Sequence, residues 1–552
     1  MKLKSLRKQN SANFIAESDN KSKAIWSIIN KERKEKTSDN ETNFCLETDD
    51  QTLTDPQEVA NYLNVFFATV AERTLKQNSL LPKQQTYATV QPKSQNQLYL
   101  SPTDQKEVLA IIDSLKPKTL AGIDKISSKL VKACKHELVA PLTLLINRSM
   151  QEGTFPDRLK ITKVYPKFKS GSKTKATSYR PISLISTFSK IIEKVILYRL
   201  TKYLDENNLL TDRQHGFLKG RSTTTAIIQL IESIIDGIEE GHIVTSLFLD
   251  FSKAFDCLDH KLLIKKLNAL GITGTPAKWF HSYLSNRMQQ VELKHTTNKT
   301  TFKVQSTLLP VHRGVPQGSV LGPVLFLLLT NDMPSSMDDI CETVMYADDT
   351  TLILKHKLEE QLDINTFIAF NTAKQYCQIN DLVLNEDKTV QLTFSTRPRL
   401  SIGLPELEDK DTTKYLGITL DEKLNWIPHI NNLCTKLSTG IYVIRRIKQV
   451  CDAEAARTAY FALVESHLRY GLAAWGGSSN SNLERVLLHQ KRAVRCLAGI
   501  GYRDSCRQAF KDLRILTVVS LYIAEVIMHT INTADCVQHY QLRHEDCYVN
   551  VI

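Results

Sequence analysis

Two adjacent carboxylates, Asp348 and Asp349, interrupt an apolar, β-branched run from Val344 to Leu354. The residues on either side predict two strands joined by a tight turn, which would place both carboxylates at the tip of a hairpin. Adjacent carboxylates raise each other's proton affinity unless cations neutralise them, so bound metal would explain both. The alternative is a solvated turn without a chemical role, and so short a motif does not decide between the two.

A third carboxylate ends another predicted strand, Ile243–Asp250. If the two strands are neighbours, Asp250 lies beside Asp348 and Asp349, and the three could hold two Mg²⁺ ions about 3.5–4 Å apart, as phosphoryl-transfer enzymes do. Mg²⁺ suits oxygen ligands, and no His/Cys cluster in the sequence competes for a softer metal. Taken alone, Asp250 could instead cap a helix that starts near Ser252.

Between these strands, the segment 312–323 is rich in glycine and proline and predicts a loop with a defined backbone shape. Its small residues would let a nucleotide or a template base approach the main chain closely. Gln317, which lies one residue before Gly318, is a polar side chain well placed for such a contact, although an ordinary loop would also fit. The apolar run Val320–Leu329 predicts a core helix and is too short to cross a bilayer.

The composition is that of a globular protein with a basic surface. The 552 residues are 42% hydrophobic, and 71 basic against 59 acidic residues give a net charge of +12. This excess favours a polyanionic partner such as nucleic acid. Eleven cysteines without a Cys-x-x-Cys pair argue against a zinc module and a disulfide framework. The first forty residues lack the apolar stretch of a secretory signal, so we expect an intracellular protein without a membrane segment, in the nucleus or the cytoplasm.

Residues 1–100 are expected to be a polar N-terminal region without an enzyme domain. They contain one predicted helix, Asn20–Lys36, and a linker rich in Gln, Pro and Asn at Lys83–Gln97. Ser101 as N-cap and Pro102 at the first helical position then predict that folded structure begins here.

Residues 101–420 mix helices with short strands, and residues 421–535 are almost entirely helical. The other predicted strands are Thr343–Tyr346, Thr350–Leu354 and Val390–Phe394. The helices after residue 421 are predicted at Ile430–Val450, Ala453–Gly471 and Asn482–Leu497. Their polar faces carry many basic residues, which could line a groove for a phosphate backbone or simply face solvent. These basic residues are Arg445, Arg446, Lys448, Arg457, Arg469, Arg485, Lys491, Arg492 and Arg495. Residues 536–552 are expected to be a frayed tail.

Three segments now match the motifs of a known family in order and spacing. They are Phe-Leu-Asp-Phe-Ser-Lys-Ala-Phe-Asp at 248–256, Gly-Val-Pro-Gln-Gly-Ser-Val-Leu-Gly-Pro at 314–323 and Tyr-Ala-Asp-Asp at 346–349. The chain resembles the reverse transcriptases of non-LTR, LINE-type retrotransposons and looks most like the jockey-like insect group. Further blocks similar to the family lie at 121–124, 178–184, 214–217 with 221–222, 384–389 and 414–418. The resemblance covers about residues 100–535.

The resemblance implies an α+β right-hand polymerase with fingers, a palm built on an antiparallel sheet and a helical thumb. Fingers and palm would occupy residues 101–420, with the core domain at about 145–420. The thumb would follow at 421–535, and its basic helices would then be the surface that binds the duplex. Asp250, Asp348 and Asp349 match the catalytic metal ligands of the family, to which the backbone carbonyl of Phe251 would add another. Two Mg²⁺ ions are implied, and Mn²⁺ could replace them.

Several other roles are carried over from the family. Lys163, Arg180 and Gln317 would meet the nucleotide, while the ring of Phe255 would act as a steric gate against the ribose 2′-hydroxyl and so favour dNTPs. Lys388 would be the general acid for the pyrophosphate leaving group. The primer grip matches Tyr415, Leu416 and Gly417.

The implied function is RNA-directed DNA synthesis, in which a primer 3′-hydroxyl attacks the α-phosphate of a dNTP opposite an RNA template. Template RNA, primer DNA and dNTPs are the expected partners. The alternative is a decayed or co-opted copy that binds RNA without catalysis. No nuclease site and no Cys/His knuckle accompany the motifs, so we expect that the chain does not nick target DNA.

Overall fold

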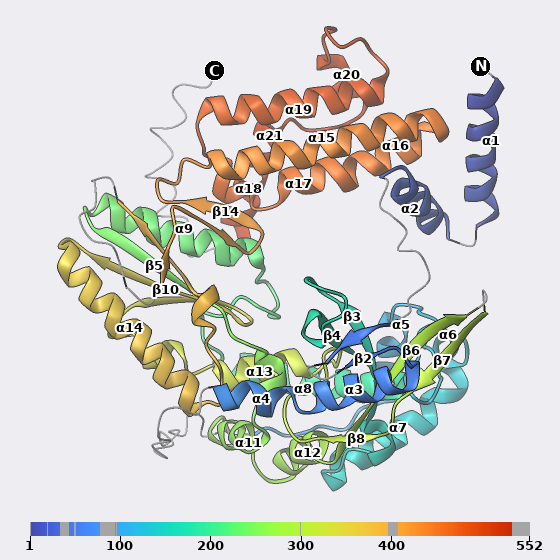
Figure 1. Cartoon of the computed structure of the whole chain (residues 1–552), viewed down its shortest axis with the longest axis vertical. Helices are drawn as coiled ribbons and strands as arrows, with labels where there is room; N and C mark the ends of the chain where they lie inside the picture. Colours follow the sequence, from blue (N-terminus) through green and yellow to red (C-terminus); the bar gives the residue numbers. More distant parts are fainter. Residues whose placement is uncertain are drawn as a thin grey trace.

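The computed structural model describes residues 2–18, 20–33, 44–48, 51–77, 94, 96–297, 300–395, 404 and 407–532. The fold combines helices with two five-stranded sheets, as the predicted α+β class requires. Figure 1 shows the elements arranged as an open ring. One sheet lies at its side, a mixed layer lies at its base, and a helical layer built from residues after 421 lies at its top.

The first five-stranded sheet, called here the central sheet, has the strand order β12-β11-β5-β10-β9. All neighbours are antiparallel except β11 and β12, which are parallel. The predicted strands are confirmed. Their continuous apolar and β-branched runs suit a sheet that is covered on both faces. The strands are β5 (Ile243–Leu249), β9 (Glu342–Tyr346), β10 (Asp349–His356), β11 (Val390–Phe394) and β12 (Glu408–Asp409).

Helices α9 (Thr223–Glu239) and α14 (Glu359–Ile379) pack on this central sheet. Successive residues of β10 belong to different cores: Leu352 joins the cluster that includes α14, whereas Ile353 joins the one that includes α9. The two helices therefore cover opposite faces. With apolar contacts on both faces, a one-residue slip of the strands would exchange the two sets of side chains, so burial fixes the register.

A second sheet at the base, called here the lower sheet, has the order β4-β3-β6-β7, with β8 paired to β6. Its strands are β3 (Ile161–Phe168), β4 (Tyr179–Leu184), β6 (Arg287–Thr297), β7 (Thr300–Gln305) and β8 (Leu309–Val311). Further helices complete this half of the molecule. They are α5 (Gln105–Ser114), α6 (Ser128–Ala133), α7 (Lys135–Glu152), α8 (Thr187–Glu206), α10 (Ala254–Cys257), α11 (His260–Ala269), α12 (Gly274–Leu284) and α13 (Gly322–Thr330).

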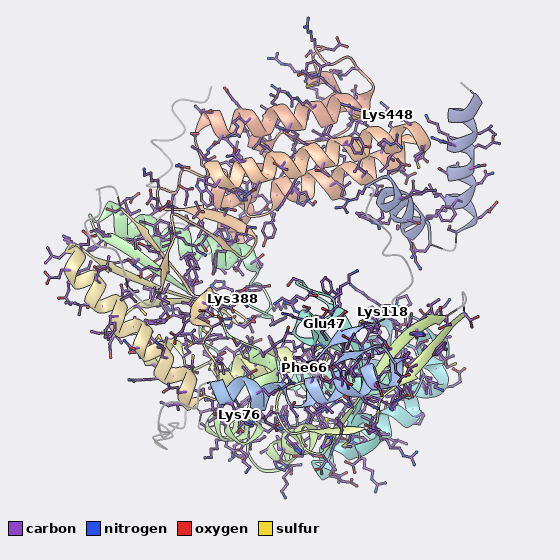
Figure 2. The ribbon with its side chains drawn as sticks, in the orientation of Figure 1. Glu47, Phe66, Lys76, Lys118, Lys388 and Lys448 are labelled. Carbon is purple, nitrogen blue, oxygen red and sulfur yellow. The ribbon has the colours of Figure 1, made fainter. Side chains whose placement is uncertain are left out.

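The expectation that folded structure begins at Ser101 is wrong. Helix α3 (Pro56–Ala68) and the hairpin β1 (Leu46–Glu47) with β2 (Thr52–Leu53) share a core with the lower sheet, and α4 (Val70–Gln77) follows. Figure 2 places Phe66 and Lys76 of these helices along the base. The apolar residues of α3 are spaced for one buried face, a signal that the polar composition of the region obscures.

The start of α5 also differs from the prediction. Asp104, and not Ser101, is the N-cap, and its side chain accepts a hydrogen bond from Glu107 N at 2.8 Å. Tertiary contacts hold the preceding residues outside the helix, because Arg199 donates to the carbonyls of Ser101 and Pro102. A local N-cap signal cannot anticipate such a partner.

The top layer is built around α15 (Ile427–Val450), against which α19 (Asn480–Ala498) packs. These two helices match their predicted positions closely. The predicted helix at 453–471 is interrupted and becomes α16 (Ala453–Tyr460), a short π-helix (Phe461–Glu465) and α17 (Ser466–Arg469). The layer is completed by α18 (Leu472–Trp475), α20 (Arg507–Asp512) and α21 (Val518–Asn532).

The first helices of the chain lie against this top layer. These are α1 (Lys2–Glu17) and α2 (Lys21–Glu32), the second of which corresponds to the predicted helix. Arg446 Nε donates to Glu32 Oε2 at 2.8 Å and links α2 to α15. Within the described ranges, no helix combines the length and the apolar character needed to cross a membrane.

Candidate active site

The register of the central sheet brings the three carboxylates of the sequence analysis together. Thr350 of β10 pairs with Leu249 of β5, so Asp349 and Asp250, one position further along each strand, lie side by side at the end of the sheet. On the other side, Asp349 pairs with Tyr346, which leaves Ala347 and Asp348 as a two-residue turn between β9 and β10. The hairpin prediction is confirmed.

The three carboxylates interact electrostatically. Burial raises the pKa of Asp348, and the charge of Asp250 raises it further. Burial, together with the charges of Asp348 and Asp250, raises the pKa of Asp349 to about 6. Asp349 is exposed at the turn. Repulsion from the neighbouring carboxylates is therefore a cause of its raised pKa alongside burial. Such a group of acids attracts cations.

Three carboxylates that repel one another match the oxygen-rich donor set that Mg²⁺ prefers. Among the residues that the structure describes, however, no three His, Cys, Asp or Glu side chains enclose a single point as ligands of one ion would. The oxygen donors and the raised pKa values of the carboxyl groups therefore fit divalent ions. The side chains do not, however, surround one point as the ligands of a bound ion do. Phe251 lies next to Asp250 and is buried, in an antiparallel bridge with Leu384.

The raised pKa of Asp349 leads to a stability prediction. Because its pKa in the native chain is about 6 and the unperturbed value is 3.8, the native state bears a charge penalty above pH 6. That penalty is lost as the pH falls through 6 toward 3.8, where the native carboxyl is already protonated. In EDTA, Asp349→Asn is expected to raise the unfolding temperature at pH 7.5 and to raise it clearly less at pH 4.5, where part of the penalty is already lost. Thermal unfolding at both pH values tests this, and an equal effect at the two would contradict it.

A group of basic side chains lies near these acids. Lys388 Nζ is 3.5 Å from Asp250 Oδ2, and both side chains are partly exposed. Figure 2 shows Lys388 on the side of the central sheet that faces the middle of the molecule. Arg180, on β4, and Lys169, just after β3, are close enough to Asp348 that their charges lower the pKa of its carboxyl, against the larger effect of burial.

Lys169 is a residue that sequence reasoning missed. Burial lowers the pKa of Lys169, and the charges of Arg180, Lys388 and Lys253 lower it further. Lys167 and Arg180 are partners in the β3–β4 hairpin, and Lys169 N donates to Ser178 O at 2.8 Å just beyond them. A period-two count along β3 places Lys163, Lys167 and Lys169 on one face and could have suggested it.

The structure does not bring Lys163 to this cluster. Lys163 is 6% exposed, and its Nζ lies 3.5 Å from Glu292 Oε1. The reason is its neighbour on β6, where Gln290 pairs with Lys163 and Glu292, two residues further on, lies on the same face of the sheet.

Phe255 lies on the short helix α10, five residues after Asp250. Its ring packs on the buried ring of Phe326 of α13, with centroids 4.6 Å apart. Val315 N donates to Phe255 O at 3.1 Å, so the glycine-rich loop supports the backbone of the helix. A Cβ on Gly314 would lie 2.8 Å from the same carbonyl, which explains why glycine stands there.

Gln317 has a partner that the sequence analysis did not consider. Its Nε2 donates to both carboxylate oxygens of Asp256, at 3.0 and 3.1 Å. Burial raises the pKa of Asp256, while the bond from Gln317 lowers it. The backbone of the loop is held as well, because Ser183 N of β4 donates to Gln317 O at 2.9 Å. The amide group of Gln317 is therefore oriented by Asp256 before any ligand binds.

A cavity of about 60 Å³ lies behind this loop. Its lining includes Asp256 and Gln317 together with Phe67 and Glu72 from the N-terminal helices. Helix α4 also packs against α10, which carries Phe255. The N-terminal segment thus supports the loop and the helix beside the acids.

Tyr415, Leu416 and Gly417 lie at the hairpin of β13 (Thr412–Tyr415) and β14 (Ile418–Asp421). Leu416 and Gly417 both have positive φ, as a two-residue hairpin turn of type I′ requires. Tyr415 is buried, and its ring packs on Phe248 of β5 with centroids 5.5 Å apart. Of these three residues, Leu416 and Gly417 of the turn can therefore contact a ligand. The hydroxyl of Tyr470 stabilises the turn by donating to Leu416 O.

Most of the basic side chains predicted for a phosphate groove make contacts within the top layer itself. Lys448 Nζ donates to the carbonyls of Cys496 and Leu497, both at 2.8 Å. Arg469 pairs with Glu465 and Glu525. Arg446, Arg457, Arg485, Arg492 and Arg495 have internal partners as well. These partners do not decide between a solvated face and a phosphate groove, and the groove stays a prediction.

The chain is similar to known proteins. Residues 167–420 match the family described as "Reverse transcriptase (RNA-dependent DNA polymerase)". The chain is 29% identical over 478 residues to the probable RNA-directed DNA polymerase from transposon BS of Drosophila melanogaster, covering 83% of this chain and 51% of that protein. It is 28% identical over 449 residues to the RNA-directed DNA polymerase from mobile element jockey of the same organism, covering 76% and 46%. The chain thus spans about half the length of these curated relatives.

A solved structure of telomerase from Candida albicans, in complex with a fragment of telomeric RNA, covers 71% of each chain at 12% identity and a TM-score of 0.37. A score of this size supports no correspondence between individual elements.

Proposed function

We propose that the chain copies RNA into DNA, because residues 167–420 match the reverse transcriptase family and the chain is similar to the polymerases of transposon BS and mobile element jockey. The observation that carries the proposal is the gathering of Asp250, Asp348 and Asp349 at one end of the central sheet, with Arg180 and Lys169 facing Asp348. Acids that hold metal and bases that hold phosphate are what nucleotidyl transfer requires. The proposed partners are template RNA, a DNA primer and dNTPs.

The proposed architecture is the right hand of a polymerase. In this assignment the lower sheet and its helices are the fingers, the central sheet with α9, α10, α13 and α14 is the palm, and the helical layer after residue 421 is the thumb (Figure 1). β4 of the lower sheet contacts the glycine-rich loop ahead of α13, where Ser183 N donates to Gln317 O. A nucleotide bound there would contact both halves.

Asp250, Asp348 and Asp349, with the carbonyl of Phe251, would hold two Mg²⁺ ions, which supply charge stabilisation for the attacking and leaving oxygens. The side chains of the chain do the positioning. Arg180 offers a planar fork of donors for phosphate oxygens, and Lys169 adds a point charge beside it. Lys388 Nζ lies near Asp250 and would carry the proton that neutralises the departing pyrophosphate.

Lys169→Ala is expected to raise the KM for dNTPs by about tenfold, which corresponds to about 1.4 kcal/mol of lost phosphate contact, and to lower kcat less. Steady-state incorporation at varied dNTP concentration measures both. Lys163→Ala is the matched control. It also removes one lysine charge, but from the buried ion pair with Glu292. It is expected to lower the unfolding temperature and leave the KM unchanged. A larger KM effect at Lys163 than at Lys169 would reverse our assignment.

The direct test of the proposal is incorporation of dTTP onto an oligo(dT) primer annealed to poly(rA) in the presence of Mg²⁺. Extension is expected for the wild-type chain. RNA binding without extension would instead support the alternative of a copy that binds RNA without catalysis.

A further inference from the structure

The segment 212–217, which we call the strap, runs beside the hairpin that carries Asp348 and Asp349. His215 N donates to Met345 O at 2.8 Å, and Met345 N donates to Arg213 O at 2.9 Å. Gln214 thereby pairs with Met345 in a parallel bridge, on the edge of β9 away from β10. The strap thus extends the central sheet by a short sixth segment at the end where the acids lie.

The side chain of Gln214 reaches the turn itself. Gln214 is 3% exposed, and its Oε1 accepts hydrogen bonds from Ala347 N at 2.9 Å and from Gly216 N at 2.7 Å. Its Nε2 lies 3.5 Å from Ala347 O. One amide group therefore contacts both backbone polar groups of Ala347, the residue directly before Asp348.

Ala347 needs such support because its backbone is strained. Its φ is +57°, in the left-handed region, where a side chain with a Cβ is disfavoured. Turns that require a positive φ at their first central position usually have glycine there. The hydrogen bonds between Gln214 and Ala347 stabilise this strained backbone conformation. The conformation in turn determines the direction in which Asp348 and Asp349 project.

The strap is itself anchored, so it can act as a fixed support. The ring of His215 bonds to Thr225 Oγ1 at 2.8 Å and to Gln229 Oε1 at 2.5 Å, both on α9. Arg221 Nη1 donates to Gln214 O at 2.7 Å. At Gly216 an added Cβ would collide with Ala347 N, so the strap and the turn pack backbone against backbone.

We propose that Gln214 is a positioning residue, whose amide group holds the turn at Ala347 so that Asp348 and Asp349 project where divalent cations and a nucleotide can reach them. This inference rests on the proposed function for the identity of the reaction. The geometry of the strap stands independently of it.

Gln214→Met tests the proposal, since it keeps the volume of the side chain and removes its hydrogen bonds. Loss of a group that orients metal ligands typically lowers metal affinity or activity by about 10- to 100-fold. We expect kcat for primer extension to fall within that range, with the KM for dNTPs changed less than twofold. Weaker binding of Mn²⁺ to the free protein, measured by electron paramagnetic resonance, is expected alongside and does not depend on catalysis.

Gln490→Met is the matched control. Gln490 is buried and its Nε2 also donates twice, to the hydroxyl of Tyr460 and to Leu516 O, but it lies on α19 in the top layer, away from the acids (Figure 1). It should lose comparable stability in thermal unfolding while kcat and Mn²⁺ affinity stay near the wild-type values. Adding Ala347→Gly to Gln214→Met should recover part of kcat, because glycine adopts the positive φ without support.

The outcomes separate the two proposals. If the wild-type chain extends primers and Gln214→Met retains kcat and Mn²⁺ affinity, the positioning role is refuted and the proposed function stands. If the wild-type chain does not extend primers, the proposed function fails. A loss of Mn²⁺ affinity confined to Gln214→Met would even then support the positioning role.

Discussion

Replacing Asp348 by asparagine is expected to abolish primer extension, with a loss of about a thousandfold or more, while the affinity for the RNA–DNA template-primer stays within about threefold. Asp348 lies in the turn between β9 and β10, where Asp250 and Asp349 raise the local negative charge. Asparagine has nearly the same size and removes only the charge. We propose that Asp348 helps to hold the cations of the reaction, so the loss should appear in kcat.

A matched variant separates this effect from a general effect of charge. Asp339 is exposed and lies shortly before β9, away from the turn. Asp339→Asn is expected to extend primers at the wild-type rate. Single-turnover extension and filter binding of the template-primer measure the two quantities for both variants. If Asp348→Asn retains more than about a tenth of the wild-type rate, the carboxylate is not a catalytic group.

The second large effect is expected at Phe255, which we propose selects deoxyribonucleotides. Its ring packs on Phe326 with centroids 4.6 Å apart, and the glycine-rich loop holds the backbone of Phe255 through Val315 N. A ring packed in this way leaves little room for an additional hydroxyl group on the sugar. Phe255→Val shortens the side chain, so preference for dTTP over UTP should fall by about 10- to 100-fold, mainly because incorporation of UTP improves.

Phe302→Val is the control for this prediction. Phe302 lies on β7 and is 45% exposed, and the centroid of its ring is 5.1 Å from that of His295. Ratios of kcat/KM for dTTP and UTP should match the wild type in that variant. Unchanged selectivity in Phe255→Val, with dTTP incorporation still efficient, would exclude a steric gate at this residue.

Much of the site could be predicted from the sequence because each strand leaves a local pattern of apolar residues. Apolar and β-branched runs mark β5, β9 and β10, and each acid stands where a strand ends. The turn at 347–348 follows from the same pattern. The side-by-side placement of Asp250 and Asp349 needed the register between β5 and β10, which no local pattern contains.

Other features depend on partners far apart in the chain. Lys163 is drawn away from the acids by Glu292, a partner on β6 that lies far from it in the chain. The bond between Gln317 and Asp256 and the bond between Gln214 and Ala347 each join segments more than sixty residues apart. The N-terminal helix α3 was missed for a related reason, since its partner surface is the lower sheet. Composition and motif spacing do not encode such pairings.

The central claim is that this chain synthesises DNA on an RNA template, and one measurement addresses it most directly. The purified chain is incubated with poly(rA), an oligo(dT) primer, dTTP and Mg²⁺, and products are resolved by length, with Asp348→Asn run beside it. Our account predicts stepwise extension by the wild-type chain and none by the variant. A folded wild-type chain that binds the template-primer but adds no nucleotide would contradict it.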